Sequence, residues 1–366
     1  MIVERVEQLT IEEALGAKAL WSEIFFEDSA VFTDYYFQEK MKNNIGYGIK
    51  QDGQLIAMLY LTPYTGQIYA PAMYGEDFAD VPLSYIVGVG TKREYRHKGC
   101  MDRLLKRALK DLHERQQPFT FLMPASAAIY TPYQFRYIYE RPEFIIKNQD
   151  TEPMQQKDAE ALAEFAQEQL KAKYQFFLKR DGIYYLRQQK ESGAQNGNIY
   201  LWKEQGEIKG FYLYAKEAEE FIQEAVVSEE LTKQGMLCVS EKRKPIIMAR
   251  ITNVAAMLSL IRLKQNSELE KAEILLRVTD SLIPQNNGTF CWTVGKKEST
   301  IALLEKSDMT PVCVDIADLT EFLFGKRSSE ECFCFSNDIE PHRQRELYER
   351  LSEIAVISRT FLNEIV

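Results

Sequence analysis

The feature that most constrains the fold is a strand, a turn, a helix and a second strand in the first third of the chain. Tyr85–Thr91 and Phe119–Met123 are rich in β-branched and aromatic residues and are predicted to be strands. Between them, apolar residues at helical spacing predict an amphipathic helix over 100–114, preceded by Gly99 and followed by Pro118. This order leaves backbone N–H groups without partners at the helix start, where an anion can bind.

The length predicts more than one compact unit. With 366 residues, the chain is longer than a usual single domain, so we expect two or three. Its 45% hydrophobic and 27% charged residues are typical of a globular protein. Apolar stretches are short, and acidic residues interrupt the first seven positions, so neither a membrane-spanning helix nor a secretory signal is expected. We therefore expect a soluble, cytoplasmic protein that does not bind membranes.

Charge and the metal-ligating residue types exclude several classes of site. A net charge of −9 disfavours nucleic acid as the main partner and favours a cationic substrate. The six cysteines are scattered without a CxxC pair, which argues against a disulfide framework and a structural zinc site. With only His97, His113 and His342 present, a histidine-rich metal site and a Ser/His/Asp triad are also disfavoured, so we expect no metal.

Periodicity predicts further elements along the chain. We expect one helix over 11–26, a hairpin at Asp52-Gly53 followed by a strand over 55–62, and a helix over 152–171. Strands over 199–202 and 208–214 should pair, and the basic run Glu241–Pro245 is predicted to be a solvated turn. A third unit is expected to begin with a strand over 246–251, followed by a helix over 254–263, strands of one sheet over 274–279, 289–294 and 299–304, and helices over 315–324 and 343–355.

The helix start carries a recognisable motif. The run Val87–Met101 resembles the acetyl-CoA signature of GNAT N-acetyltransferases, in which Arg/Gln-x-x-Gly-x-Gly/Ala joins a strand to a helix. Arg96, Gly99 and Met101 occupy the three marked positions, with Met101 in place of the usual small residue. Ala125–Phe135 is similar to a segment of the Eis (enhanced intracellular survival) branch, as are residues 248–254, 276–280 and 361–366.

This resemblance implies an α+β fold with three parts. Members of the branch have a GNAT domain with a mixed sheet flanked by helices, a central GNAT-like domain and a C-terminal sterol-carrier-like α/β domain. We place these at residues 1–150, 151–245 and 246–366, with a central unit that is shorter than usual. Relatives associate into trimers or hexamers, so the resemblance also implies a homo-oligomer.

The cofactor implied by the resemblance is acetyl-CoA, acting as a cosubstrate. Its pyrophosphate would bind backbone N–H groups at the helix start, with added positive charge from two side chains. Its pantetheine arm would pair with the preceding strand, whose N–H near Val89 would stabilise the oxyanion, and the end of the next strand would flank it. The implied cofactor residues are Val89, Gly90, Thr91, Arg96, His97, Lys98, Gly99, Cys100, Met101, Asp102, Ala125 and Ser126. A helix that merely has a glycine near its start is the structural alternative.

Two catalytic groups follow from the same resemblance. Tyr130 takes the position of the Eis catalytic tyrosine and would protonate the leaving thiolate, with Tyr133 as the alternative donor. The carboxylate of Val366 would accept the proton of the attacking amine. Tyr130 as one more core tyrosine, and a terminus packed only for stability, are the competing interpretations.

The acceptor is the least constrained part of the prediction. The expected function is transfer of acetyl to a primary amine of an aminoglycoside, polyamine or lysine type by direct attack in a ternary complex. Acidic residues near the expected mouth could attract such a cation, although each could equally be a solvated loop charge: Glu27, Asp28, Asp34, Glu76, Asp77 and Asp80. The alternative function is a non-catalytic protein that binds acyl-CoA or lipid on the same scaffold.

Overall fold

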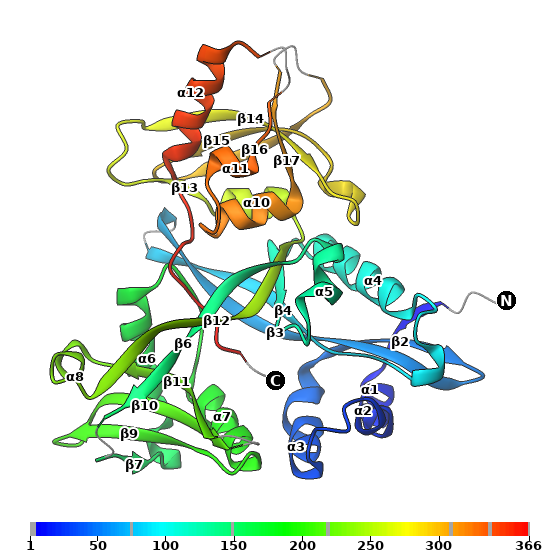
Figure 1. The fold of residues 1–366 in the computed structure, drawn as a ribbon, viewed down its shortest axis with the longest axis vertical. Coiled ribbons are helices and arrows are strands. Elements are labelled where there is room, and N and C mark those ends of the chain that lie inside the picture. The colour runs from blue at the N-terminus through cyan, green and yellow to red at the C-terminus, as the bar shows by residue number, and fades with distance from the viewer. Residues whose placement is uncertain are drawn as a thin grey trace.

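The structure is a computed structural model that describes residues 5–73, 76–147, 150–216, 220–306, 310–335 and 339–364. It has the predicted α+β architecture, built on one large mixed sheet, two four-stranded sheets and one two-stranded sheet (Figure 1). None of the described helices is long and apolar enough to span a membrane.

The large sheet draws strands from all parts of the chain. Its main path has the order β1-β2-β3-β4-β5-β12-β6, and β8 joins β3 to β19. The predicted hairpin at Asp52-Gly53 is confirmed, since both residues have the positive φ angles (50° and 78°) that a tight two-residue turn needs. The strands are β1 (Val6–Gln8), β2 (Ile45–Gln51), β3 (Gln54–Met73), β4 (Glu76–Thr91), β5 (Phe119–Leu122), β6 (Arg136–Ile146), β8 (Phe176–Leu178), β12 (Leu237–Ile251) and β19 (Thr360–Phe361).

Helices cover both faces of this sheet. Along β3, Met58 and Tyr60 pack with α1 (Ile11–Gly16), α2 (Lys18–Ile24) and α3 (Ala30–Tyr35), whereas Leu59 and Leu61 pack with α4 (Cys100–Glu114). The alternation therefore sandwiches the strand between two apolar clusters. The helix predicted over 100–114 is confirmed at both ends. The single helix predicted over 11–26 is wrong, because it divides after Gly16, a weak helix former, into α1 and α2. After α3 follow a π-helical turn, Tyr36–Lys40, and a 3-10 turn, Met41–Asn43.

The middle of the chain forms a second sheet with the order β11-β10-β9-β7. The predicted pairing of two strands around Gln205-Gly206 is confirmed. The helix predicted to begin at 152 is wrong, because Glu152-Pro153 is a strand and the helix begins only after a capping box between Gln155 and Asp158. The elements are β7 (Glu152–Pro153), α6 (Ala159–Lys173), α7 (Gly182–Ala194), β9 (Asn198–Glu204), β10 (Glu207–Lys216), β11 (Glu220–Val227) and α8 (Glu229–Lys233).

The prediction that the basic run 241–245 forms a turn is wrong. These residues are the exposed part of β12. Two neighbours explain this: β6 pairs with the first part of β12, and β5 pairs with Met248–Ile251. The strand predicted over 246–251 thus exists as the last part of β12 and lies in the large sheet. The division of the chain at 150/151 and 245/246 stays a prediction, and β12 crosses its second boundary.

The C-terminal part forms a third sheet with the order β16-β15-β14-β17, which confirms that the three predicted strands share one sheet. The predicted helices are present: α9 and α10 are shorter than predicted, whereas α12 begins two residues before and ends three residues before the predicted bounds. The elements are α9 (Val254–Ser259), β13 (Arg262–Leu263), β14 (Lys271–Thr279), β15 (Gly288–Gly295), β16 (Ser299–Leu304), β17 (Val312–Asp315), α10 (Ile316–Leu323), α11 (Ser329–Cys332), α12 (Pro341–Ser352) and β18 (Ile354–Ala355). The chain then returns to the large sheet through β19, which pairs with β8.

Candidate active site

Strands β4 and β5 part in the middle of the large sheet. They run parallel but pair only at Ser84↔Thr120 and Tyr85↔Phe121. Among the described residues, no pairing joins the rest of β4, residues 86–91, to β5, so that edge of β4 keeps backbone groups available for a ligand. Val89, Gly90 and Thr91 therefore lie on an open strand edge.

A β-bulge shapes this edge. Tyr60 of β3 lies opposite Val87 and Met58 lies opposite Gly90, so one residue of β3 faces both Gly88 and Val89. Gly88 has φ +59°, and a Cβ there would lie 2.4 Å from Cζ3 of Trp21. Only glycine fits this position, and the bulge changes the direction of the backbone at Val89.

The start of α4 has the geometry of an anion site. Gly99 is its N-cap in a left-handed conformation (φ 77°), with no side chain capping the helix. The N–H groups of Cys100, Met101 and Asp102 belong to the first turn, which has no intrahelical acceptors. His97, Lys98 and Gly99 are exposed, so a bound anion can reach this turn.

Side chains around this turn are held in place. Nε of Arg96 donates to the carbonyl of Thr91 at 3.2 Å, and the Lys98 ammonium lies 4.9 Å from the centre of the Tyr95 ring. The Asp102 carboxylate would repel a phosphate, but Lys106 pairs with it at 2.9 Å. Cys100 is buried, which supports a packing role for its thiol.

Tyr130 lies at the end of α5 (Ala127–Tyr130), just after β5. It packs in the same apolar cluster as Val89 and Met101, so the structure brings the predicted acid to the predicted cofactor edge. Burial raises the pKa of Tyr130 to about 12, and no hydrogen bond to its hydroxyl is recorded among the described residues. The phenol therefore stays protonated at neutral pH. Ala125 and Ser126 are exposed on the loop between β5 and α5, as expected for residues that flank a ligand.

Tyr133 has a different environment. Burial raises the pKa of Tyr133, and the negative charge of the Asp102 carboxylate raises it further. Since Asp102 lies in the first turn of α4, the Tyr133 side chain is near the helix start. Tyr133 is only half-buried, whereas Tyr130 is buried.

The chain end approaches the same region. Val366 lies outside the described residues, but Glu364 is buried, with its carboxylate accepting from the hydroxyls of Tyr184 at 2.8 Å and Tyr64 at 3.2 Å. Burial raises the pKa of Tyr85, and the charges of Glu364 and Tyr130 add to this shift, so both groups act on Tyr85. Figure 1 places the end of the described chain between the large sheet and the middle part.

A cavity of about 350 Å³ lies beside this chain end, where β3 and the π-helical turn face α7. Sequence reasoning missed these residues because they come from distant segments with no motif of their own. Lys40, which lines the cavity, forms a buried ion pair with Glu191 at 2.6 Å. The lining residues are Lys40, Asn43, Thr62, Pro63, Tyr64, Tyr184, Arg187 and Gln188.

Of the acidic residues predicted at the mouth, the four with described side chains, Glu27, Asp28, Asp34 and Asp80, do not line this cavity. Asp34 pairs with Lys18, Asp80 pairs with Lys179 at 2.7 Å, and Asp28 accepts from the indole of Trp21 at 2.9 Å. Glu27 is exposed, and the side chains of Glu76 and Asp77 lie outside the described part. Within that part, no group of three or more His, Cys, Asp or Glu residues could hold a metal ion.

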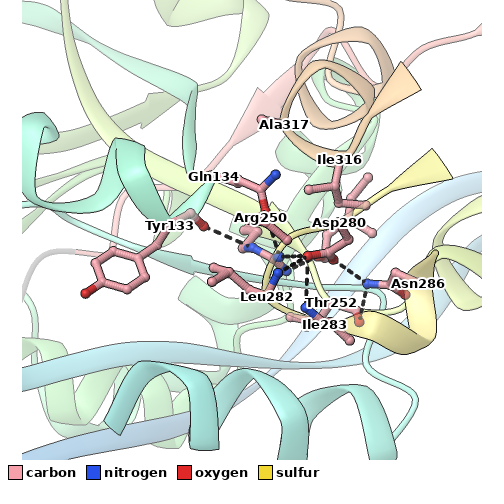
Figure 2. A network of polar contacts seen from close by, with 12 residues as sticks. Tyr133, Gln134, Arg250, Thr252, Asp280, Leu282, Ile283, Asn286, Ile316 and Ala317 are labelled. Atoms are coloured by element: carbon pink, nitrogen blue, oxygen red, sulfur yellow. Dashed lines mark hydrogen bonds and ion pairs between the residues drawn. The ribbon is translucent and has the colours of Figure 1, made fainter. Parts of the chain in front are cut away.

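A buried network of polar contacts fixes residues 131–134, the turn that follows Tyr130, called the tyrosine turn below (Figure 2). Arg250 and Asp280 have fully buried side chains and form an ion pair at 2.5 Å. Arg250 also donates from Nε to the carbonyl of Tyr133 at 3.0 Å and from Nη2 to Oε1 of Gln134 at 3.2 Å. Figure 2 shows the Tyr133 carbonyl facing Arg250 and its ring directed away.

The network extends into the C-terminal part. Asp280 accepts from the N–H groups of Leu282 and Ile283, each at 2.9 Å, and from Nδ2 of Asn286 at 2.9 Å. Gln134 donates to the carboxylate of Asp315, which caps α10. The turn that follows Tyr130 is therefore fixed by residues far away in the sequence.

Comparisons with known proteins agree with this description. Residues 5–138 match the acetyltransferase (GNAT) domain model, and residues 254–354 match the sterol carrier protein domain model. No curated protein sequence matches the chain. The chain thus contains a GNAT acetyltransferase domain, whose family uses acyl-CoA, and a C-terminal sterol carrier domain.

Several solved structures share the fold over nearly the full length. A probable N-acyltransferase from Enterococcus faecalis V583 has 19% identity and a TM-score of 0.74, covering 98% of this chain and 100% of that chain. A GCN5-related N-acetyltransferase from Anabaena variabilis has 16% identity and a TM-score of 0.73, covering 97% and 99%. Eis1 from Mycobacterium abscessus has 15% identity and a TM-score of 0.70, covering 98% and 99%. The resemblance to the Eis fold is confirmed.

Proposed function

We propose that this GNAT acetyltransferase transfers the acetyl group of acetyl-CoA to a primary amine by direct attack in a ternary complex. One observation carries the proposal: residues of the open β4 edge, the uncapped start of α4 and the buried Tyr130 all belong to one apolar cluster.

The cofactor is held by backbone groups in this proposal. The pyrophosphate binds the N–H groups at residues 97–102, where the helix dipole favours an anion, and Arg96 and Lys98 add positive charge. The pantetheine amides pair with the edge of β4 at Val89–Thr91. The absence of a capping side chain at Gly99 supports this arrangement, since nothing occupies the donors.

The chemical step needs an oxyanion donor and an acid. The amine nitrogen attacks the thioester carbon, and the carbonyl oxygen gains negative charge that the N–H at Val89 stabilises. The C–S bond then breaks, and the CoA thiolate takes a proton from Tyr130. A pKa of about 12 for this phenol, against about 8.5 for a thiol, makes full transfer uphill. Tyr130 therefore acts best as a hydrogen-bond donor that transfers its proton as the sulfur gains charge.

The proton of the amine goes to the terminal carboxylate of Val366. Support comes from Glu364, two residues earlier, which is fixed beside the cavity between Tyr64 and Tyr184. A free carboxyl has a pKa of about 3.5, so the proposal requires burial or a bridging water to make it an effective base. The cavity beside it is the proposed acceptor site.

Release of free thiol from acetyl-CoA, measured with aminoglycoside, polyamine and lysine-peptide acceptors, tests the proposal. We expect turnover with at least one amine, and Tyr130→Phe should lower kcat by roughly 10²–10⁴-fold, the usual worth of a general acid. Its matched control is Tyr133→Phe, which should retain most activity. Residues added after Val366 should also abolish turnover.

The binding of CoA separates the competing functions. Tyr130→Phe should bind CoA as tightly as the wild type, because its hydroxyl acts on the sulfur only during the reaction. Retained CoA binding without turnover of any amine would contradict the enzymatic proposal and favour a protein that only binds acyl-CoA.

A further inference from the structure

A second, larger cavity lies away from the candidate active site. It has a volume of about 950 Å³, is open to solvent, and lies between strands β6 and β12 on one side and the sheet of β9, β10 and β11 on the other. In Figure 1, β6 and β12 extend from the large sheet toward this smaller sheet. None of its lining residues belongs to the cofactor edge, the helix start or the tyrosine turn. Cavities of this size accept small organic ligands.

The charge of its lining is opposite to that of the whole chain. Among the described residues that line the cavity, Arg141, Lys242, Arg243 and Lys244 are cations and only Glu143 is acidic. Within the described part of the chain, none of these four cations forms an ion pair. In a chain with a net charge of −9, this cluster is a local excess of positive charge that faces one space.

Of these four cations, Arg141 has the least favourable surroundings for its charge. It lies directly opposite Lys244 across the β6–β12 pair, and like charges in that register destabilise a sheet. Its Nη1 is buried with no hydrogen-bond partner among the described residues, and burial lowers the pKa of Arg141. The side chain as a whole is half-buried, and its buried, unsatisfied Nη1 costs free energy that an anion in the cavity would recover.

The rest of the lining is aromatic. The rings of Tyr200 and Tyr212 stack with centres 5.2 Å apart, and the Arg141 guanidinium lies 5.3 Å from the centre of the Phe221 ring. Phe144 and Tyr200 also border the apolar cluster under β9–β11. Flat apolar surfaces next to cations suit a planar ring that carries a negative charge.

We propose that this cavity binds a small aromatic anion, with Arg141 and Lys244 contacting the charged group and Tyr200 and Tyr212 contacting the ring. The inference does not depend on the proposed acetyl transfer. It also gives a role to the basic run 241–245, which the acetyltransferase reaction leaves unused.

Calorimetric titration of the full chain with four probes tests this inference. The probes are 1-naphthyl phosphate, 1-naphthoate, neutral 1-naphthol and inorganic phosphate. We expect both aromatic anions to bind, and 1-naphthol and inorganic phosphate to bind at least about tenfold more weakly, because each lacks one half of the recognised structure. Whichever of the two aromatic anions binds more tightly shows whether the charged group of the ligand is a phosphate or a carboxylate.

Arg141→Gln should weaken binding of the aromatic anions by about tenfold or more, the worth of a charged hydrogen bond. Its matched control is Lys110→Gln, the same loss of charge on the exposed face of α4, which should leave affinity unchanged. Arg141→Gln should also stabilise the unliganded protein slightly, because it removes the unpaired charge. Equal affinity for 1-naphthol, unchanged affinity in Arg141→Gln, or no binding of either aromatic anion would overturn the inference.

Discussion

Two buried arginines connect the C-terminal third of the chain to the active site, and they do so differently. Arg250 faces one carboxylate, Asp280, and three neutral oxygens from Tyr133, Gln134 and Ile251. Arg180 instead faces two carboxylates, those of Glu224 at 2.5 Å and Glu364 at 3.3 Å.

The two arginines differ in how closely the number of carboxylates around each guanidinium matches its single positive charge. In the Arg250 network the charges balance, and Asp280 is further stabilised by backbone N–H donors. In the Arg180 network one guanidinium serves two carboxylates, and its Nε has no hydrogen-bond partner among the described residues. The first network therefore fixes the tyrosine turn, whereas the second holds the chain end with one guanidinium between two carboxylates.

The largest expected effect is on the balanced network. Asp280→Asn leaves Arg250 buried without its counter-charge, and we expect a loss of about 3–5 kcal/mol in the free energy of unfolding. Chemical denaturation measures this loss. Asp318→Asn removes a half-exposed partner of Arg327 and should cost less than about 1 kcal/mol. Similar losses in the two variants would contradict the role given to the buried pair.

A smaller effect is expected in the other network. Glu224→Gln removes one carboxylate from Arg180 but leaves Glu364 as its counter-charge. The loss in unfolding free energy should be about 2 kcal/mol, the worth of one charged hydrogen bond. A loss as large as that of Asp280→Asn would show that the two networks do not differ as described.

Glu364→Gln should affect activity more than stability. The amide keeps the size of the side chain but weakens its bonds to Arg180 and the two tyrosines, so the chain end becomes less well placed. We expect kcat to fall by roughly tenfold, as for a misplaced catalytic group. Steady-state kinetics with the best amine acceptor measure this, with Glu349→Gln as the exposed control. An unchanged kcat would show that the position of the chain end does not affect the reaction.

The smallest effect concerns pH. Burial raises the pKa of Tyr130 to about 12, so the folded state favours the neutral phenol. Its contribution to stability is complete below a pH of about 10, the value for an unfolded tyrosine, and is lost as the pH rises toward 12. Tyr130→Phe should therefore lose less stability than the wild type between those values in alkaline denaturation. Equal losses would contradict the burial of this hydroxyl.

Sequence alone predicted the parts of the site that are local. The helix at 100–114, the glycine before it and the strands on either side follow from spacing and turn residues within one short segment. The resemblance then predicted a GNAT domain and a C-terminal sterol carrier domain, which the comparisons confirm. The positions of Tyr130 and Val89 in one cluster agree with the predicted site, although their catalytic roles stay predictions.

The long-range contacts could not be predicted. Strand β12 joins the large sheet because β5 and β6 offer free edges, which no local pattern in residues 237–251 indicates. Likewise, Arg250 and Asp280 meet across thirty residues of sequence, and Glu364 meets Tyr64 across three hundred. Charge spacing carries no information about such partners, because each pairing depends on how whole sheets pack.

The most direct measurement is a crystal structure of the protein with bound coenzyme A. The account predicts the diphosphate on the N–H groups of the loop before α4, the pantetheine along the free side of β4, and the sulfur facing the hydroxyl of Tyr130. Coenzyme A bound elsewhere, or a sulfur directed away from that hydroxyl, would contradict it.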